Sequence, residues 1–234
     1  MSGSSEAALI FGASGGLANS LADDLLKRGW IVDLVSRESR RSVLKARFRE
    51  AIAAGTARVF TVANTYTGFA AERPYRTYLF TQALFEPKLL TETADGRVEQ
   101  EIAVGLADPI VLTRSLLLAH PPAPTERRDF AFIGSTSAYA GFKKTAVYCA
   151  VKHGLLGFVR AMNDEYSETE TRFWLFSMGT MNTEMGALLA DQEPSSFLQP
   201  EDAARRILDS LTAPTNLFEP EVIMRRRKIR FESK

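Results

Sequence analysis

The sequence has little cysteine and histidine: one cysteine, Cys149, and two histidines, His120 and His153, occur in 234 residues. A single cysteine excludes both a disulfide within the chain and a thiolate cluster for a metal. The histidines do not have metal-ligand spacing, and neither belongs to a cluster of cysteines or carboxylates. We therefore predict no metal site and a reducing compartment, with the cytoplasm as the expected location.

The sequence also lacks an excess of charge of either sign. It has 29 lysines and arginines against 28 aspartates and glutamates, a formal net charge of +1. Broad attraction to nucleic acid or to a membrane needs a basic field over much of the surface, so we expect neither as a partner. Two local basic clusters remain, at residues 37–49 and 225–230. The second is interpreted as a solvated edge or tail, with a subunit contact or an anionic substrate as alternatives.

Apolar residues make up 45% of the chain and occur in short runs that alternate with segments of helical periodicity. The first run, residues 7–11, is too short for a signal sequence or a membrane span. Strands are predicted at 7–11, 30–35, 58–62, 78–80, 130–134, 173–177 and 222–224. Helices are predicted after residue 16 and at 42–54, 98–119, 147–165 and 201–211. The alternation predicts an α/β fold, a doubly wound parallel sheet (Rossmann fold) in a single three-layer α/β/α domain over 1–234.

The turn between the first predicted strand and helix is rich in small residues. Gly12, Gly16 and Ala18 follow the pattern Gly-x-x-x-Gly-x-(Gly/Ala). Small residues let the backbone approach a pyrophosphate, which free N–H groups at a helix start stabilise. A purely structural tight turn is the alternative, and the position directly after the first strand argues against it.

A second signal is Tyr148-x-x-x-Lys152 on a predicted helix, where positions i and i+4 share one face. A lysine that close stabilises a phenolate, so we expect Lys152 to lower the pKa of Tyr148 towards a useful acid/base value. Alone, the pair is no more than a surface contact. Ser135, 13 residues before the tyrosine, stands at the end of a predicted strand, where open α/β sheets place their chemistry.

Together the glycine turn, Ser135 and Tyr148-x-x-x-Lys152 resemble the short-chain dehydrogenase/reductase family, of the compact single-domain type, over nearly the whole chain. The resemblance implies an enzyme that transfers a hydride between a nicotinamide cofactor and a carbonyl or secondary alcohol of a small organic substrate. It implies that Tyr148 exchanges a proton with the substrate oxygen, that Ser135 hydrogen-bonds this oxygen, and that Lys152 also holds the nicotinamide ribose. It implies as well a substrate loop at about 184–200 and a homodimer or homotetramer packed through helices 98–119 and 147–165.

The cofactor is expected to be NADP(H) rather than NAD(H). Spacing alone nominates Asp33 as a ribose ligand, but the ribose should meet the end of the second strand, at Ser36 and Arg37, where a hydroxyl and a guanidinium suit a 2′-phosphate. Gly15 stands where NADP users often carry a basic residue, and a solvated helix face remains the alternative for the arginines. The expected cofactor-binding residues are Gly12, Ser14, Gly15, Gly16, Leu17, Ser36, Arg37, Ala83, Tyr148, Lys152 and Thr183. For Thr183, a local helix cap is an equally good interpretation.

The sequence departs from the family at two further places. The Asn-Asn-Ala-Gly turn after the fourth strand is replaced by residues 81–84, Thr-Gln-Ala-Leu, and a leucine is unfavourable if that position needs positive φ. Gly105 aligns with the asparagine that holds a water in the proton relay, and Pro109 suggests that a freed carbonyl could hold this water instead. These departures favour the alternative of a catalytically weak, NAD(P)-binding sensor or assembly partner. A sugar-nucleotide epimerase or dehydratase, a third possibility, usually needs a larger C-terminal region.

Overall fold

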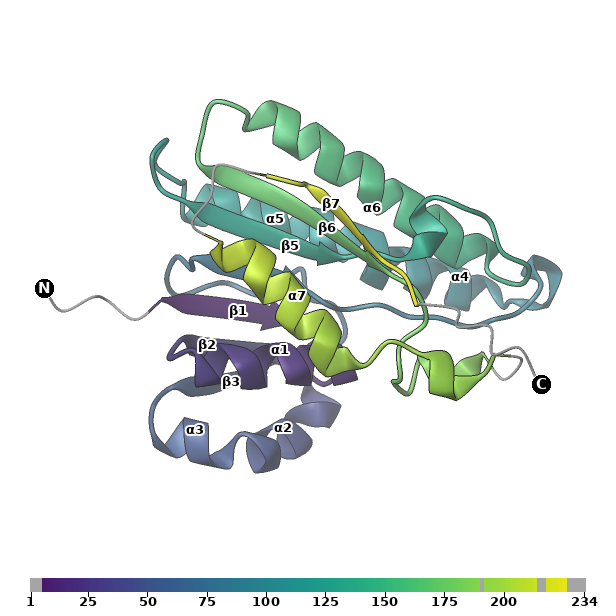
Figure 1. The fold of residues 1–234 in the computed structure, drawn as a ribbon, viewed down its shortest axis with the longest axis horizontal. Helices are drawn as coiled ribbons and strands as arrows, with labels where there is room; N and C mark the ends of the chain where they lie inside the picture. The colour runs from purple at the N-terminus through teal and green to yellow at the C-terminus, as the bar shows by residue number, and fades with distance from the viewer. Residues whose placement is uncertain (1–5, 190–191, 214–217, 227–234) are drawn as a thin grey trace, which may run out of the picture.

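In this computed structural model, which describes residues 6–189, 192–213 and 218–226, the strands form one sheet (Figure 1). The described strands pair in the order β3-β2-β1-β4-β5-β6-β7, and every pairing is parallel. Their bounds are β1 Ala7–Phe11, β2 Ile31–Arg37, β3 Ala57–Val62, β4 Thr77–Phe80, β5 Arg128–Ile133, β6 Thr171–Met178 and β7 Glu221–Met224. The strand order reverses between β1 and β4, which opens a crevice at their carboxyl ends.

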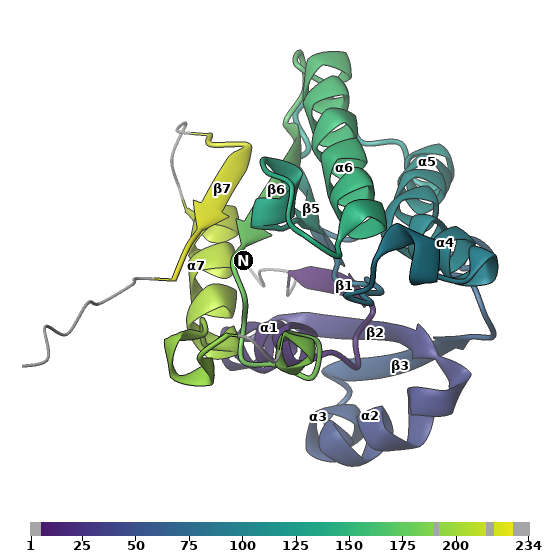
Figure 2. The same cartoon turned by 90° about the vertical axis from the view of Figure 1, so that its right-hand side faces the viewer.

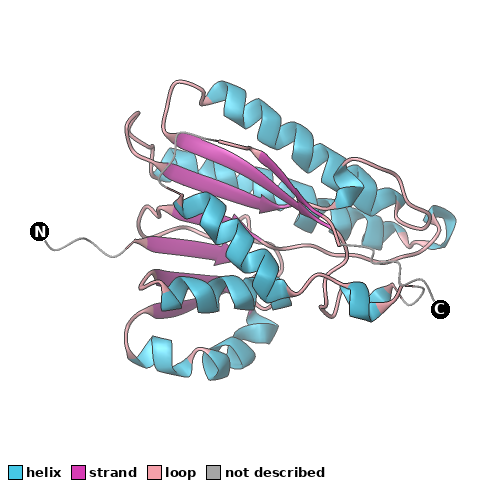
Figure 3. Ribbon diagram, viewed as in Figure 1, coloured by secondary structure: helices cyan, strands magenta, loops and turns pink. Residues whose placement is uncertain are grey.

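Helices cover both faces of the sheet (Figures 2 and 3). They are α1 Gly16–Lys27, α2 Arg41–Arg47, α3 Arg49–Ala53, α4 Asp95–Ile102, α5 Asp108–Ala119, α6 Ala146–Glu165 and α7 Pro200–Thr212. On one face α1 packs beside α7, on the other lie α4, α5 and α6, and α2 and α3 lie against β3. The predicted doubly wound, three-layer Rossmann arrangement is confirmed. That residues 1–234 form a single domain stays a prediction.

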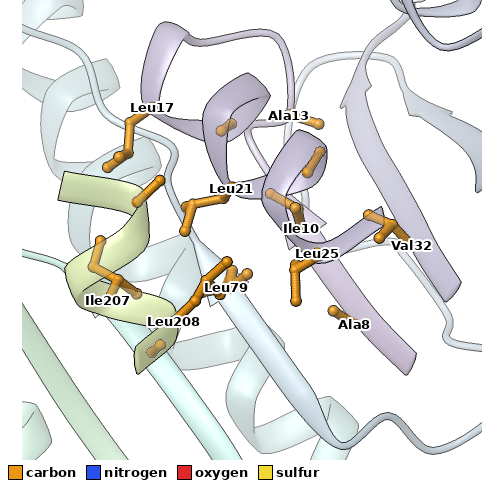
Figure 4. Close-up of a cluster of buried hydrophobic side chains, with 14 of the residues drawn as sticks. Ala8, Ile10, Ala13, Leu17, Leu21, Leu25, Val32, Leu79, Ile207 and Leu208 are labelled. Carbon is orange, nitrogen blue, oxygen red and sulfur yellow. The ribbon is translucent and has the colours of Figure 1, made fainter. Parts of the chain in front are cut away.

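The inner strands β1, β2, β4, β5 and β6 are buried on both faces, which explains why they appear in the sequence as largely continuous apolar runs. Along β1, Ala8 and Ile10 point into the cluster under α1 and α7, while Leu9 and Phe11 point into the cluster under α5 and α6. Figure 4 shows the first cluster, where Leu21 of α1 lies among side chains of β1 and α7. Both helical layers are therefore fixed to the sheet by side chains that alternate along the same strands.

The predicted helix at 98–119 begins earlier, at Asp95, and is not regular. A π-helical turn, Ala103–Ala107, separates α4 from α5. Pro109 explains this interruption, because a proline has no N–H to donate and its ring crowds the carbonyl four residues before it. The predicted helix at 42–54 is likewise divided, at Phe48, into α2 and α3.

The combined helix Asp95–Ala119 is the one segment among the described residues with the length and composition of a membrane span. Its most apolar window has a mean hydropathy of 1.7, and 33% of that window is buried. Leu112 and Leu116 of this helix pack into the core cluster that lies under α5 and α6. The helix therefore belongs to the layer that covers the sheet, and part of its apolar surface is left open.

A buried ionic cluster lies at the amino end of the sheet, away from the crevice. Asp129 of β5 has no exposed surface and accepts hydrogen bonds from Arg172 Nε at 2.7 Å and Trp174 Nε1 at 2.8 Å. Arg76 forms a further ion pair with it. Both arginine side chains are largely buried, 17% and 12% exposed for Arg76 and Arg172.

We expect Asp129→Asn to lower the free energy of unfolding by about 3–5 kcal/mol, because it leaves buried guanidinium groups without a countercharge. Asp23→Asn is the matched control: Asp23 pairs with Arg47 at 2.6 Å on the surface, and its loss should cost less than about 1 kcal/mol. Urea denaturation of both variants measures the difference. Equal midpoints would show that the Asp129 cluster adds nothing to stability.

Candidate active site

A single cavity of about 1310 Å³ runs along the carboxyl edge of the sheet. Residues at the ends of six strands line it, namely Gly12, Arg37, Thr81, Gly134, Gly179 and Arg225. Its volume exceeds the roughly 300–1,000 Å³ of a pocket for one drug-sized ligand. The cavity therefore has room for a large ligand and a smaller one together, at the edge where open α/β sheets bind ligands.

The β1–α1 turn forms one wall of the cavity. Gly12 has φ +77°, and an added Cβ would lie 2.6 Å from the backbone nitrogen of Gln82, so only glycine fits there. Helix α1 begins at Gly16 with no side-chain cap and no acidic residue in its first turn. The N–H groups at its start are thus left for an anion, and Ser14, Gly15 and Leu17 line the cavity beside them.

The turn after β4 faces the glycine turn. Thr81 Oγ1 donates to the carbonyl oxygens of Phe11 at 2.7 Å and Gly12 at 3.2 Å, so threonine ties β4 to β1. Ala83 and Leu84 line the cavity. Lys144 is the one non-glycine residue with positive φ in the described part of the chain, so Leu84 occupies an ordinary conformation. The expected conflict at Leu84 therefore does not exist.

Gln82 in the same turn is a residue that the sequence did not single out. Its side chain is 7% exposed and lines the cavity, and neither its Oε1 nor its Nε2 has a hydrogen-bond partner among the described residues. A buried amide without partners is costly, so this position suits a polar ligand. The only signal in the sequence was its place in the altered turn.

The predicted trio meets at the centre of the cavity. Ser135 follows β5, is 9% exposed, and its hydroxyl accepts from the N–H of Ser137 at 3.1 Å. Tyr148 and Lys152 lie one turn apart on α6, and Lys152 Nζ donates to the carbonyl oxygen of Ile133 at 2.7 Å. The ammonium lies 5.4 Å from the centre of the Tyr148 ring. All three side chains line the cavity.

Arg37 and Ser36 have different environments, although they are neighbours at the end of β2. Arg37 lines the cavity, together with Arg40. Ser36 is fully buried, donates to the Arg37 carbonyl oxygen at 3.2 Å, and does not contribute to the cavity wall. The strand continues to Arg37 rather than ending at residue 35, so alternate side chains point in opposite directions and only the arginine reaches the cavity.

Asp33 lies outside the cavity wall and is occupied elsewhere. It is fully buried, bonded to Arg58 at 2.6 Å and to the Tyr75 hydroxyl at 2.5 Å. Burial opposes ionisation of this carboxyl, but hydrogen bonds from Arg58 and Tyr75 outweigh it and hold the pKa of Asp33 below its usual value. This arrangement agrees with the expectation that the cofactor ribose is bound at the end of β2 and not by Asp33.

Thr183 closes the cavity beside the α1 start. Its methyl carbon would lie 3.1 Å from a Cβ at Gly16. Its hydroxyl accepts from the N–H of Gly186 at 3.2 Å, which is the local capping bond considered as the alternative for this residue. Thr183 therefore combines a place in the cavity wall with a structural bond, and its contact with a cofactor stays a prediction.

Comparisons with known proteins agree with this geometry. The family model for the short chain dehydrogenase matches residues 79–194, which include Ser135, Tyr148 and Lys152. The chain belongs to the short-chain dehydrogenase/reductase family. This is a family of oxidoreductases that use nicotinamide cofactors.

A sepiapterin reductase of Chlorobaculum tepidum is 27% identical over 94 residues, which cover 40% of this chain and 38% of that reductase. A short-chain dehydrogenase/reductase from Vibrio parahaemolyticus has a TM-score of 0.81 and 21% identity, covering 97% of this chain and all of that one. A variant actinorhodin polyketide ketoreductase with NADPH has a TM-score of 0.82 and 20% identity, covering 94% and 95% of the two chains. At these identities the two structures support the fold.

The titration of the trio differs from the expectation that Lys152 lowers the pKa of Tyr148. Burial raises the pKa of Tyr148 to about 12, and a hydrogen bond with Ser135 opposes part of this shift. Burial also lowers the pKa of Lys152 to about 8. The Lys152 ammonium donates its hydrogen bond to the Ile133 carbonyl oxygen and not to the phenol. Desolvation is therefore the main influence on the pKa of Tyr148.

The family's asparagine does not fit at position 105. Gly105 lies in the π-helical turn Ala103–Ala107 and is buried against α6, where an added Cβ would lie 2.6 Å from Cγ1 of Val151. Gly105 is also absent from the cavity wall, although Ala103 and Val104 line it. Glycine at this position is thus required by helix packing, and the freed carbonyl suggested for the proton relay stays a prediction.

We expect Gly105→Ala to lower the free energy of unfolding by about 1–3 kcal/mol, because the new methyl group overpacks the contact with Val151. Combining it with Val151→Ala should recover part of the loss, so a double-mutant cycle by urea denaturation should show favourable coupling. Gly96→Ala, in α4 where an added Cβ meets nothing, is the control and should change stability little. Independent, additive costs at 105 and 151 would contradict the contact.

Proposed function

We propose that this protein is an NADP(H)-dependent oxidoreductase that transfers a hydride between nicotinamide and the carbonyl or secondary alcohol carbon of a small organic substrate. The observation that carries the proposal is the meeting of Ser135, Tyr148 and Lys152 in the same cavity as an uncapped, glycine-lined helix start. The bound cofactor would supply or accept the hydride. The Gly12 turn and the buried Gln82 amide, which has no hydrogen-bond partner among the described residues, are the groups that suit its phosphates and polar edges.

The protein's own residues would control the proton. With a pKa of about 12, Tyr148 stays protonated at neutral pH and can donate to a carbonyl oxygen. Ser135 would donate a hydrogen bond to the same oxygen, and the Lys152 ammonium, with a pKa of about 8, places positive charge beside the phenol. The neutral phenol is the form that can donate a proton to a carbonyl oxygen.

Two arginines support the choice of NADP(H). Arg37 and Arg40 line the end of the cavity next to β2, where a 2′-phosphate of an adenosine bound over β1 and β2 would lie. A guanidinium pairs with such a phosphate through charge-assisted hydrogen bonds. The ketoreductase of similar fold contains NADPH.

A catalytically weak, NAD(P)-binding sensor or assembly partner is the second candidate. It is favoured by the Gly105–Val151 contact, which leaves no space for the family's asparagine. The oxidoreductase would show turnover that depends on Tyr148, whereas the sensor would bind the cofactor without such turnover.

Binding and turnover should separate these possibilities. We expect NADPH to bind more tightly than NADH, and Arg37→Gln to weaken NADPH binding by about tenfold while leaving NADH unaffected. Arg49→Gln, an exposed arginine of the same cluster outside the cavity wall, is the control. Calorimetric titration measures each affinity. Tight NADH binding that is indifferent to Arg37 would overturn the choice of cofactor.

The catalytic part of the test uses a panel of ketones with NADPH. Tyr148→Phe should reduce kcat by at least about 100-fold while NADPH affinity is retained. NADPH binding without any Tyr148-dependent turnover would support the sensor.

We also propose that the chain forms a homodimer or homotetramer through α4, α5 and α6. Ile102, Val111 and Leu118 of the α4–α5 helix are 43%, 40% and 64% exposed, an apolar surface suited to a second copy. Sedimentation velocity should show an oligomer that Val111→Glu with Leu118→Glu converts to monomer. A wild-type monomer at micromolar concentration would contradict it.

We also propose a cytoplasmic location, which the buried lone Cys149 supports.

A further inference from the structure

A second set of basic residues lines the cavity, apart from Arg37 and Arg40. Lys143, in the segment between β5 and α6, and Arg225 and Arg226, directly after β7, all line the cavity wall. Among the described lining residues, Glu184 is the only carboxylate. The cavity wall therefore carries, in addition to Arg37 and Arg40, positive charge that the trio and the glycine turn do not explain.

Arg225 and Arg226 lie several strands away from the proposed site of the cofactor phosphates, along the same edge of the sheet. Four strands, β1, β4, β5 and β6, lie between β2 and β7, and Figure 2 shows β7 and β3 at opposite edges. Five strand spacings amount to about 24 Å, and the glycine turn after β1 is about 19 Å from β7. Arg225 and Arg226 are thus too far from the α1 start to share the phosphates expected there.

Arg226 is held in place at the wall of the cavity. Its Nη1 donates to Ser196 Oγ at 3.1 Å, and its guanidinium carbon lies 6.0 Å from the ring centre of Phe197. Phe197 is itself 6% exposed. One N–H group and the stacked face of Arg226 are therefore committed to residues of the 184–200 loop, while Arg225 beside it is exposed.

The surface between these arginines and the trio is largely apolar. Met178 ends β6, the strand between β5 and β7, and Met181, Met185 and Leu189 follow it; all four line the cavity. Ser135 follows β5 and Arg225 follows β7, so the reacting carbon and the cations are about 10 Å apart, two strand spacings. An apolar spacer of this length would connect a carbonyl at Tyr148 to an anion at the arginines.

We propose that the substrate carries an anionic group, a carboxylate or a phosphate, separated by an apolar spacer from the carbonyl that is reduced, and that Arg226, Arg225 and Lys143 bind this group. The proposal rests on the proposed reductase function, whose substrate class it names. The basic residues of the cavity wall thereby divide into one group for the cofactor and another for the substrate.

The test uses methyl ketones that end in a carboxylate, a phosphate or an uncharged methyl ester, with two to seven methylene groups between the ends. With NADPH present, we expect the long-spaced carboxylates or phosphates to exceed their esters in kcat/KM by at least about tenfold. The acid-to-ester ratio should fall by about tenfold in Arg226→Gln and in Lys143→Gln. The control, Arg205→Gln, removes an exposed arginine of α7 whose partner is Asp202 and should leave the ratio unchanged.

A binding measurement gives an independent readout. Octanoate should bind the complex with NADP⁺ more tightly than octanamide, and Arg226→Gln should remove the difference. Tyr148-dependent turnover of the esters with no preference for any anion would overturn this inference and leave the reductase intact. The absence of turnover with every ketone, together with equal binding of octanoate and octanamide, would contradict both. A preference for the phosphate over the carboxylate would identify the anion.

Discussion

The close approach of the β1–α1 turn to the end of β4 is the contact on which the site depends. At Gly12 the two backbones are so close that a Cβ would lie 2.6 Å from Gln82 N, and Thr81 Oγ1 closes the gap through its bond to Phe11 O at 2.7 Å. This contact lies at the switch point of the sheet, where neighbouring connections leave in opposite directions. It aims the start of α1 at the crevice and leaves the Gln82 amide buried beside it.

The position of the catalytic trio follows from packing on the other face of the sheet. Helix α6 is anchored by buried residues such as Leu155 and Val159, which fixes its rotation. That rotation directs Lys152 to the carbonyl oxygen of Ile133 and presses Val151 against Gly105 of the π-helical turn. One helix orientation thus places the ammonium and excludes a side chain at position 105.

The balanced net charge is distributed unequally along the strands. The buried carboxylates Asp33 and Asp129 lie in the amino halves of β2 and β5, where they neutralise arginines that stabilise the fold. The cavity at the carboxyl ends receives Arg37, Arg40, Lys143, Lys152, Arg225 and Arg226 with one described carboxylate, Glu184. A net charge near zero therefore coexists with a basic cavity, because buried acidic residues such as Asp33 and Asp129 form ion pairs at the amino end of the sheet, away from the cavity.

The sequence by itself determined the element order, the glycine turn and the trio, because these depend on local spacing: apolar runs, small residues between a strand and a helix, and an i, i+4 pair. It placed Ser36 wrongly with Arg37, since the face of each side chain depends on where β2 ends. The π-helical turn, the ordinary backbone at Leu84, the burial of the Gln82 amide in the cavity wall and the raised pKa of Tyr148 could not be inferred from spacing. Only the tertiary structure decided them, because each depends on contacts or burial supplied by residues distant in the chain.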